Sequence, residues 1–173
     1  MNRVTTHHSL FTMTCPPPTG NESVYTKLTR FCFFQERCTT DISRKLQEWK
    51  IPQPEAIRLI RQLKRDGFLD ERRFAGIYAR GKFREKKWGK VRIRHELLKR
   101  DIPTAMICEA LGEIDEEEYL RTIRNLIRRK KKEIPAKKTL NIREKILNFV
   151  VGKGFESDMV LRVLNELQIE DGD

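Results

Sequence analysis

Basic side chains interleaved with aromatic ones are the pattern in this 173-residue sequence that points to a particular chemistry. Tyr78, Phe83 and Trp88 are the aromatic members. The basic residues around them are Arg80, Lys82, Arg84, Lys86, Lys87, Lys90, Arg92 and Arg94. Lysine and arginine neutralise phosphates or meet acidic protein patches, and aromatic rings stack on bases. Two alternatives stay open: Tyr78 belongs to a core, and Trp88 closes a turn between two helices.

The charge of the chain is concentrated around the same residues. The formal net charge is +11. Residues 58–100 hold sixteen Lys or Arg and five Asp or Glu, whereas the rest of the chain holds twenty of each. A basic segment attracts polyanions, of which nucleic acid is the commonest inside cells. The alternative is a solvated basic surface without a partner.

Signals for catalysis and metal binding are missing. Gly152-Lys153-Gly154 lacks the context of a phosphate-binding loop, and no GxSxG, HExxH or paired Cys/His ligand set is present. His95 lies between charged residues of a basic helix and is interpreted as a surface residue. His7, His8 and Cys15 fall in a polar tail that we do not expect to bind a metal. We expect a protein that is not an enzyme and has no cofactor and no metal.

Cysteine usage and hydropathy suggest a cellular location. None of the four cysteines, Cys15, Cys32, Cys38 and Cys108, forms a CxxC pair, so we expect reduced thiols, most of them in the core of a cytoplasmic protein. No run of about 18 apolar residues exists, so no membrane span is expected. We also expect a monomer.

Helical periodicity runs through the chain after the tail, with no convincing strand alternation. Thr39, Thr40 or Asp41 is expected to cap the second helix, Asp70 to cap the fourth, and Gly67 to end the third. The expected inner stripe of the fourth helix is Phe74, Ile77, Tyr78 and Gly81, and Ile93, Leu97 and Leu98 are candidates for burial in the fifth. Beside the stripe lie Arg73, Arg80, Arg84 and Lys87. In the helix over 115–133, Tyr119, Ile123, Leu126 and Ile127 face inward, and Arg121, Arg124 and Arg128 take the opposite side.

A repeated spacing divides these helices into three units. An apolar anchor is followed five residues later by a second apolar residue in Leu46–Ile51, Leu97–Ile102 and Val150–Phe155. Each pair precedes an amphipathic helix. The sequence therefore predicts an all-α fold of three tandem three-helix repeats in an elongated, curved array, because such small units gain stability by stacking. The expected ranges are 1–22 for a disordered tail, then 23–69, 70–113 and 114–170 for the repeats.

At these residues the sequence resembles the RecX family, bacterial regulators of the RecA recombinase. The resemblance is densest in Gly67-Phe68-Leu69-Asp70-Glu71, Arg73-Phe74-Ala75, Tyr78, Trp88-Gly89, Arg92-Ile93, Glu96-Leu97 and Ile102. Where the family usually has Lys-Gly-Ile, this chain has Arg100-Asp101-Ile102, which puts the turn before Ile102 in question. The likeness extends more loosely over residues 24–168.

The resemblance implies three tandem three-helix repeats and a role. RecX-like proteins bind along the groove of the RecA–DNA filament and restrain its ATPase, strand-exchange and co-protease activities, within recombination, DNA repair and the SOS response. The expected contacts with RecA, and weak, salt-dependent contacts with single- or double-stranded DNA, come from Arg73, Arg80, Arg84, Lys87, Lys90, Arg92, Arg94, Arg121, Arg124 and Arg128. An alternative is direct DNA binding by helix-turn-helix-like units.

Overall fold

The protein is an elongated stack of helices in a computed structural model that describes residues 23–134 and 141–169. Within those ranges there are nine helices and no strand. They are α1 (Val24–Phe34), α2 (Thr39–Glu48), α3 (Gln53–Arg65), α4 (Glu71–Lys86), α5 (Lys90–Leu98), α6 (Thr104–Gly112), α7 (Glu116–Glu133), α8 (Ile142–Gly152) and α9 (Ser157–Glu166). No helix of the described residues is long and apolar enough to span a membrane.

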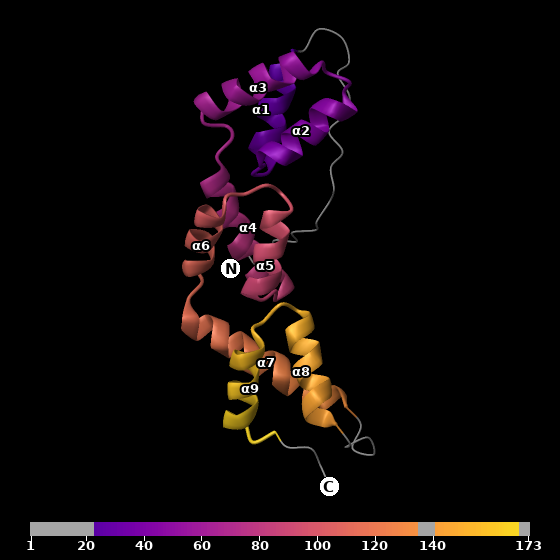
Figure 1. The fold of residues 1–173 in the computed structure, drawn as a ribbon, viewed down its shortest axis with the longest axis vertical. Coiled ribbons are helices and arrows are strands. Elements are labelled where there is room, and N and C mark those ends of the chain that lie inside the picture. Colours follow the sequence, from indigo (N-terminus) through magenta and orange to yellow (C-terminus); the bar gives the residue numbers. More distant parts are fainter. Residues whose placement is uncertain (1–22, 135–140, 170–173) are drawn as a thin grey trace, which may run out of the picture.

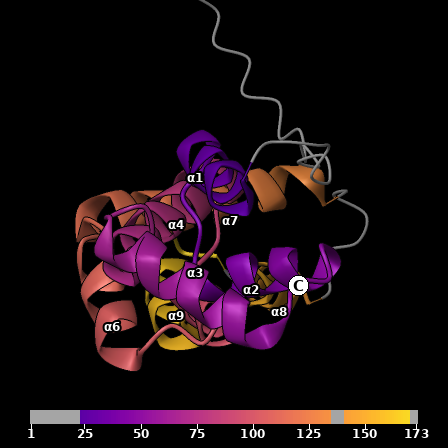
Figure 2. The same cartoon turned by 90° about the horizontal axis from the view of Figure 1, so that it is seen from above.

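The helices form three tiers along one axis (Figure 1). We call α1–α3 unit 1, α4–α6 unit 2 and α7–α9 unit 3. Seen from above, the tiers overlap, as expected of a stack (Figure 2). The all-α fold of three-helix units predicted from the sequence is confirmed. The predicted boundaries at 69/70 and 113/114 fall in the connectors that follow α3 and α6. The predicted tail, with His7, His8 and Cys15, lies outside the described residues.

The same turn occurs in the middle of each unit. The residue four positions after the apolar anchor has a left-handed backbone in all three: Lys50 with φ 56°, Asp101 with φ 57° and Gly154 with φ 90°. Asp101 therefore keeps the turn that was in question, because aspartate is one of the few residues apart from glycine that visit this region. The shared conformation supports the repeat that the sequence spacing predicts.

Helix caps follow the sequence at two of the three predicted places. Asp70 accepts a hydrogen bond from the backbone N–H of Arg73 at 2.9 Å, and Gly67 (φ 77°) follows the end of α3 as expected. The second helix is different, because its cap is Cys38. Asp41 lies at the third helical position, from which its carboxylate accepts the Cys38 N–H at 3.5 Å. The prediction of a cap at Thr39, Thr40 or Asp41 was therefore wrong by one to three residues.

The inner face of α4 is rotated from its predicted position. Ile77 is 45% exposed, and the buried face is formed by Phe74, Ala75, Ala79 and Phe83. α4 packs against α6, and a search for large apolar residues misses the two buried alanines. Similarly, Leu98 is 45% exposed, while its neighbours Ile93 and Leu97 are fully buried.

Units 2 and 3 share one continuous core, which runs from Phe74 to Ile169. At its centre the ring of Tyr119 lies between those of Phe83 and Phe155, with centroid distances of 5.6 and 5.0 Å. The Tyr119 hydroxyl donates to a carboxylate oxygen of Glu156 at 2.6 Å and accepts the Lys90 N–H at 2.9 Å. One buried side chain thus joins α4, α5, α7 and the start of α9.

Two glycines bring the backbones of units 2 and 3 into contact. The Gly89 N–H donates to the Lys153 carbonyl at 2.9 Å, and the Val91 N–H donates to the Gly154 carbonyl at 3.0 Å. A Cβ on Gly89 would lie 2.0 Å from the Gly154 oxygen, and one on Gly154 would lie 2.2 Å from the Arg92 Cβ. Neither position has room for a side chain.

We expect Gly89→Ala to destabilise the protein by roughly 1–3 kcal/mol, because its methyl group would force two backbones apart. Gly81→Ala is the matched control. Gly81 lies inside α4 with open space around it, so alanine should stabilise the helix by about 0.5–1 kcal/mol. Urea unfolding followed by circular dichroism measures both, and equal effects would contradict the glycine contact.

Tyr119→Phe should lower the free energy of unfolding by about 1–3 kcal/mol, because the Lys90 N–H and the Glu156 carboxylate lose a buried partner. Tyr25→Phe removes an exposed hydrogen bond to Asp66 and should cost less than half as much, since water replaces that partner. The same urea titration compares them, and a neutral Tyr119→Phe would exclude the hydroxyl as a link between units 2 and 3.

Candidate nucleic-acid interface

Several of the predicted site residues are already paired with carboxylates. On and around α4 the pairs are Arg73 with Glu36 at 2.9 Å, Arg80 with Glu113, and Arg84 with Glu118 at 3.6 Å. On α7 they are Arg121 with Glu117 at 3.8 Å and Arg124 with Glu166 at 3.0 Å. The side-chain hydrogen bond to Glu36 also raises the pKa of Arg73. These five arginines connect helices or support one, so their charge is partly neutralised within the protein.

A second group of cations has no carboxylate partner among the described residues. It contains Lys82, Lys86, Lys87 and Arg92, at the end of α4 and the start of α5. Arg128, on α7, is also exposed without such a partner. The structure therefore divides the predicted site residues: Lys87 and Arg92 stay available at the corner between α4 and α5, whereas Arg73, Arg80 and Arg84 do not.

Aromatic rings hold two of these cations, Arg92 and Lys82, in place. The Arg92 guanidinium lies 4.2 Å from the centroid of the Trp88 ring, and the Lys82 ammonium lies 5.4 Å from it. Lys82 is also 5.1 Å from the Tyr78 ring, which the Arg100 guanidinium approaches at 5.0 Å. A cation over a ring face is attracted by the ring quadrupole. Tyr78 and Trp88 are both half-buried, so each combines packing with support of a cation.

Unit 3 extends this surface in a way that the sequence did not reveal. Lys153, whose carbonyl accepts the Gly89 N–H, places its ammonium 5.3 Å from the Phe149 ring. Lys130 lies 5.0 Å from the same ring and also pairs with Glu133 at 3.1 Å. Lys153 is distant from Trp88 in sequence but is brought to it by the glycine contact. We call the combined surface the basic–aromatic patch: Lys82, Lys86, Lys87, Trp88, Arg92, Lys130, Phe149 and Lys153.

Two further predicted residues have local roles. The backbone N–H of Lys90 binds the Tyr119 hydroxyl, and its ammonium lies 4.9 Å from the Tyr119 ring. Arg94 contacts the Cys108 sulfur at 3.7 Å through both terminal nitrogens. Lys90 therefore stabilises the junction of units 2 and 3, and Arg94 links α5 to α6.

Other groups that could do chemistry are inert or dispersed in the described residues. Cys32 and Cys38 are buried free thiols, and burial raises the pKa of each to about 11, so neither is a reactive thiolate at neutral pH. Cys108 is a free, exposed thiol, and His95 is exposed. No group of three or more His, Cys, Asp or Glu in the described residues is placed to hold a metal ion.

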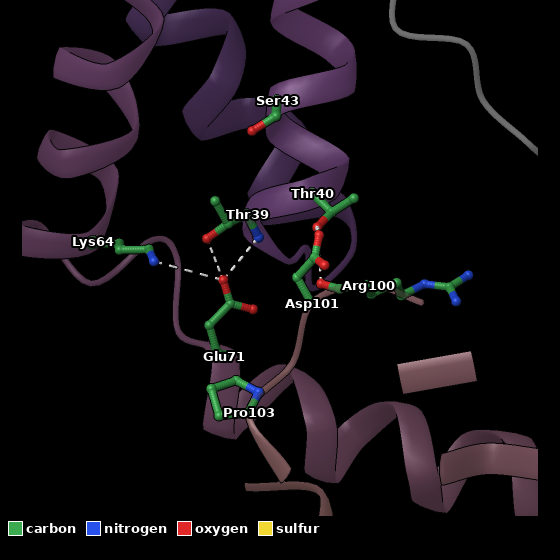
Figure 3. A pocket seen from close by; sticks show the side chains of 8 residues that line it. All are labelled: Thr39, Thr40, Ser43, Lys64, Glu71, Arg100, Asp101 and Pro103. Carbon is green, nitrogen blue, oxygen red and sulfur yellow. Dashed lines mark hydrogen bonds and ion pairs between the residues drawn. The ribbon is translucent and has the colours of Figure 1, made fainter. Parts of the chain in front are cut away.

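A polar cavity of about 360 Å³ lies between units 1 and 2 (Figure 3). Its lining is Thr39, Thr40, Ser43, Lys64, Glu71, Arg100, Asp101 and Pro103. The carboxylate of Glu71 is already bound to Thr39 within it. This cavity therefore carries polar contacts between two units and lacks the unpaired cations of the basic–aromatic patch.

Known proteins resemble this chain at two levels: a family model matches unit 2, and individual relatives match most of the sequence. The family model "RecX, second three-helix domain" matches residues 70–111. The "Regulatory protein RecX" of Clostridium acetobutylicum is 29% identical over 150 residues, covering 83% of this chain and 69% of that protein. The protein of the same name from Bacillus cytotoxicus is 24% identical over 152 residues, which are 88% of this chain. The chain spans little more than half of that relative, 56% of its length.

Two solved structures have the same fold. The crystal structure of RecX from Lactobacillus salivarius superposes with a TM-score of 0.71 at 19% identity, covering 84% of this chain and 95% of that one. Another, described as "Crystal structure of regulatory protein RecX", gives a TM-score of 0.71 at 21% identity over 84% of this chain and 70% of the other. At these identities the structures support the fold alone. Together with the domain match on residues 70–111 and the relatives along most of the sequence, they show that this chain is similar to RecX proteins.

Proposed function

We propose that this protein modulates the RecA recombinase, mainly as an inhibitor, by binding along the groove of the RecA–DNA filament. Bound there, it restrains ATP hydrolysis, strand exchange and co-protease activity. The observation that carries the proposal is the basic–aromatic patch, a set of cations presented on an elongated stack of helices in a chain similar to RecX proteins.

The physical basis is preorganisation of charge. Ordering a free lysine or arginine side chain on binding costs about 0.5–1.5 kcal/mol. Lys82, Arg92 and Lys153 already rest on aromatic rings, so less of that cost falls on the complex. Such cations suit a phosphate backbone, whose binding depends on charge and weakens steeply with salt. We propose that the patch contacts the DNA of the filament, and that the paired arginines have structural roles.

We propose a regulator without enzymatic activity that acts by occupancy, as a monomer, in the cytoplasm, within recombination, DNA repair and the SOS response. The alternative is a protein that binds duplex DNA directly and needs no RecA. The available cations at the corner of α4 and α5 favour this alternative equally, so experiment must separate the two.

RecA ATPase and strand-exchange assays test the leading proposal. Added at substoichiometric amounts at low salt, the protein should reduce both activities, because one bound molecule obstructs the groove for neighbouring subunits. A gel-shift titration on duplex DNA without RecA is the companion measurement. Unchanged RecA activities in the presence of folded protein would refute the proposal, and tight, sequence-specific duplex binding would support the alternative.

Charge removal from the patch should weaken binding far more than charge removal from the ion pairs. The patch variant is Lys82→Gln, Arg92→Gln and Lys153→Gln. It should lower the slope of log affinity against log salt for DNA-bound filaments by up to about 0.9 for each phosphate that is no longer neutralised.

The matched control is Arg72→Gln, Arg80→Gln and Arg84→Gln, which also removes three positive charges, all of them from α4. These arginines face Glu109, Glu113 and Glu118. Exposed pairs of this kind contribute about 0–1 kcal/mol each, so the control should fold and keep most of the salt slope. Equal losses in the two variants would show that the patch has no special role.

A further inference from the structure

The two junctions of the stack are built from different interactions. Units 2 and 3 are joined by a continuous apolar core and by two backbone hydrogen bonds. Unit 1 has a core of its own, centred on Leu28, Ile42 and Leu63. Within the described residues Cys38 is the member of unit 1 that is buried in the larger core, and no backbone–backbone hydrogen bond joins unit 1 to units 2 and 3. The first junction therefore depends on side chains.

Glu71, at the start of α4, is the centre of these contacts (Figure 3). One carboxylate oxygen accepts hydrogen bonds from the Thr39 hydroxyl and from the Thr39 N–H, the latter at 2.9 Å, and lies 3.8 Å from the Lys64 ammonium. Thr39 is the first residue of α2, where a negative charge meets the positive end of the helix dipole. The other carboxylate oxygen is buried without a partner among the described residues.

Two more side chains, Thr40 and Arg73, make polar contacts at the junction. The Thr40 hydroxyl donates to the Arg100 carbonyl at 2.8 Å, with a carboxylate oxygen of Asp101 3.2 Å away (Figure 3). Arg73 pairs with Glu36 at 2.9 Å and donates to the Gly67 carbonyl at 3.1 Å. The hydrogen bonds of Glu71, Thr40 and Arg73 are exposed or only partly buried. We refer to the contacts of Glu71 and Thr40 as the polar latch.

The costs of opening the two junctions therefore differ. Separating units 2 and 3 would expose Phe83, Tyr119 and Phe155, and buried aromatic side chains are among the largest contributors to the stability of a core. Opening the polar latch exchanges hydrogen bonds with protein for hydrogen bonds with water, and the net change per bond is small. It also returns the unpartnered Glu71 oxygen to solvent, and the cavity of about 360 Å³ beside the latch leaves room for movement.

We propose that the array is articulated at the junction of units 1 and 2, with units 2 and 3 forming one rigid body. The polar latch closes the joint in one orientation, and the backbone crosses the joint after Leu69, which is buried in the core of unit 1. The curvature of the array is then adjustable at one place only. This conclusion rests on the contacts within the chain and is independent of the partner.

Distance measurements between spin labels test the articulation in the full chain. Labels are attached through Gln47→Cys in α2, Ala105→Cys in α6 and Asp158→Cys in α9, all at exposed positions. Cys15 and Cys108 are replaced by serine, while Cys32 and Cys38 stay because they are buried. The distance distribution for 47 and 105 should be at least twice as wide as the distribution for 105 and 158.

Latch variants supply the second measurement. Glu71→Gln combined with Thr40→Val should widen or shift the 47–105 distribution and leave the 105–158 distribution unchanged. Glu109→Gln, which breaks the ion pair of Arg72 inside unit 2, is the matched control and should change neither. Circular dichroism confirms folding of each variant. Two equally narrow distance distributions would overturn the proposal. A 47–105 distribution that is the same in the latch variant as in the unchanged latch would also overturn it.

Discussion

The contact between Gly89 and Gly154 is the constraint on which the rest of units 2 and 3 depends. Only with both side chains absent do the start of α5 and the turn between α8 and α9 come close enough for two backbone hydrogen bonds. That approach aligns the rings of Phe83, Tyr119 and Phe155 and buries the Tyr119 hydroxyl between two partners. The same contact brings Lys153 and Phe149 to the corner that carries Trp88 and Arg92. Close packing of two units and the surface proposed to bind DNA thus have one cause.

The pairing of cations with carboxylates, more than the net charge, decides which lysines and arginines of this protein are free to meet a polyanion. Along α4, Arg80 and Arg84 reach Glu113, just after α6, and Glu118 of α7, whereas Lys82 of α4 and Arg92 of α5 meet aromatic rings. An ion pair reduces the field that an incoming phosphate experiences, but a ring leaves the cation's charge in place while restricting its motion. The highly basic segment is therefore divided into arginines paired with glutamates and a smaller group of unpaired cations that we propose to bind DNA.

The two junctions join similar three-helix units through different interactions, so they differ in how easily they open. At the second junction, glycine permits backbone contact and an apolar core. At the first, the equivalent surfaces carry Thr39, Thr40 and Glu71, and they meet through hydrogen bonds around a cavity. Polar contacts are replaced by water at little net cost, whereas buried aromatic surface is not. A stack of three units therefore has one firm joint and one adjustable joint.

Much of this architecture was determined by the sequence alone. Apolar periodicity, Asp70, Gly67 and the repeated five-residue spacing predicted the helices and the three units, because these signals are local and each unit carries its own copy. The inward face of α7 followed from the same periodicity.

Tertiary packing decided the rest. The face of α4 that turns inward includes two small buried alanines and leaves Ile77 exposed, and the cap at Cys38 depends on a hydrogen bond to Asp41. The division of the cations into paired and available groups depends on carboxylates from other helices, and Lys153 joins the patch through a glycine contact distant in sequence. Spacing along a chain reports which face a residue occupies, but it does not report which groups that face will meet.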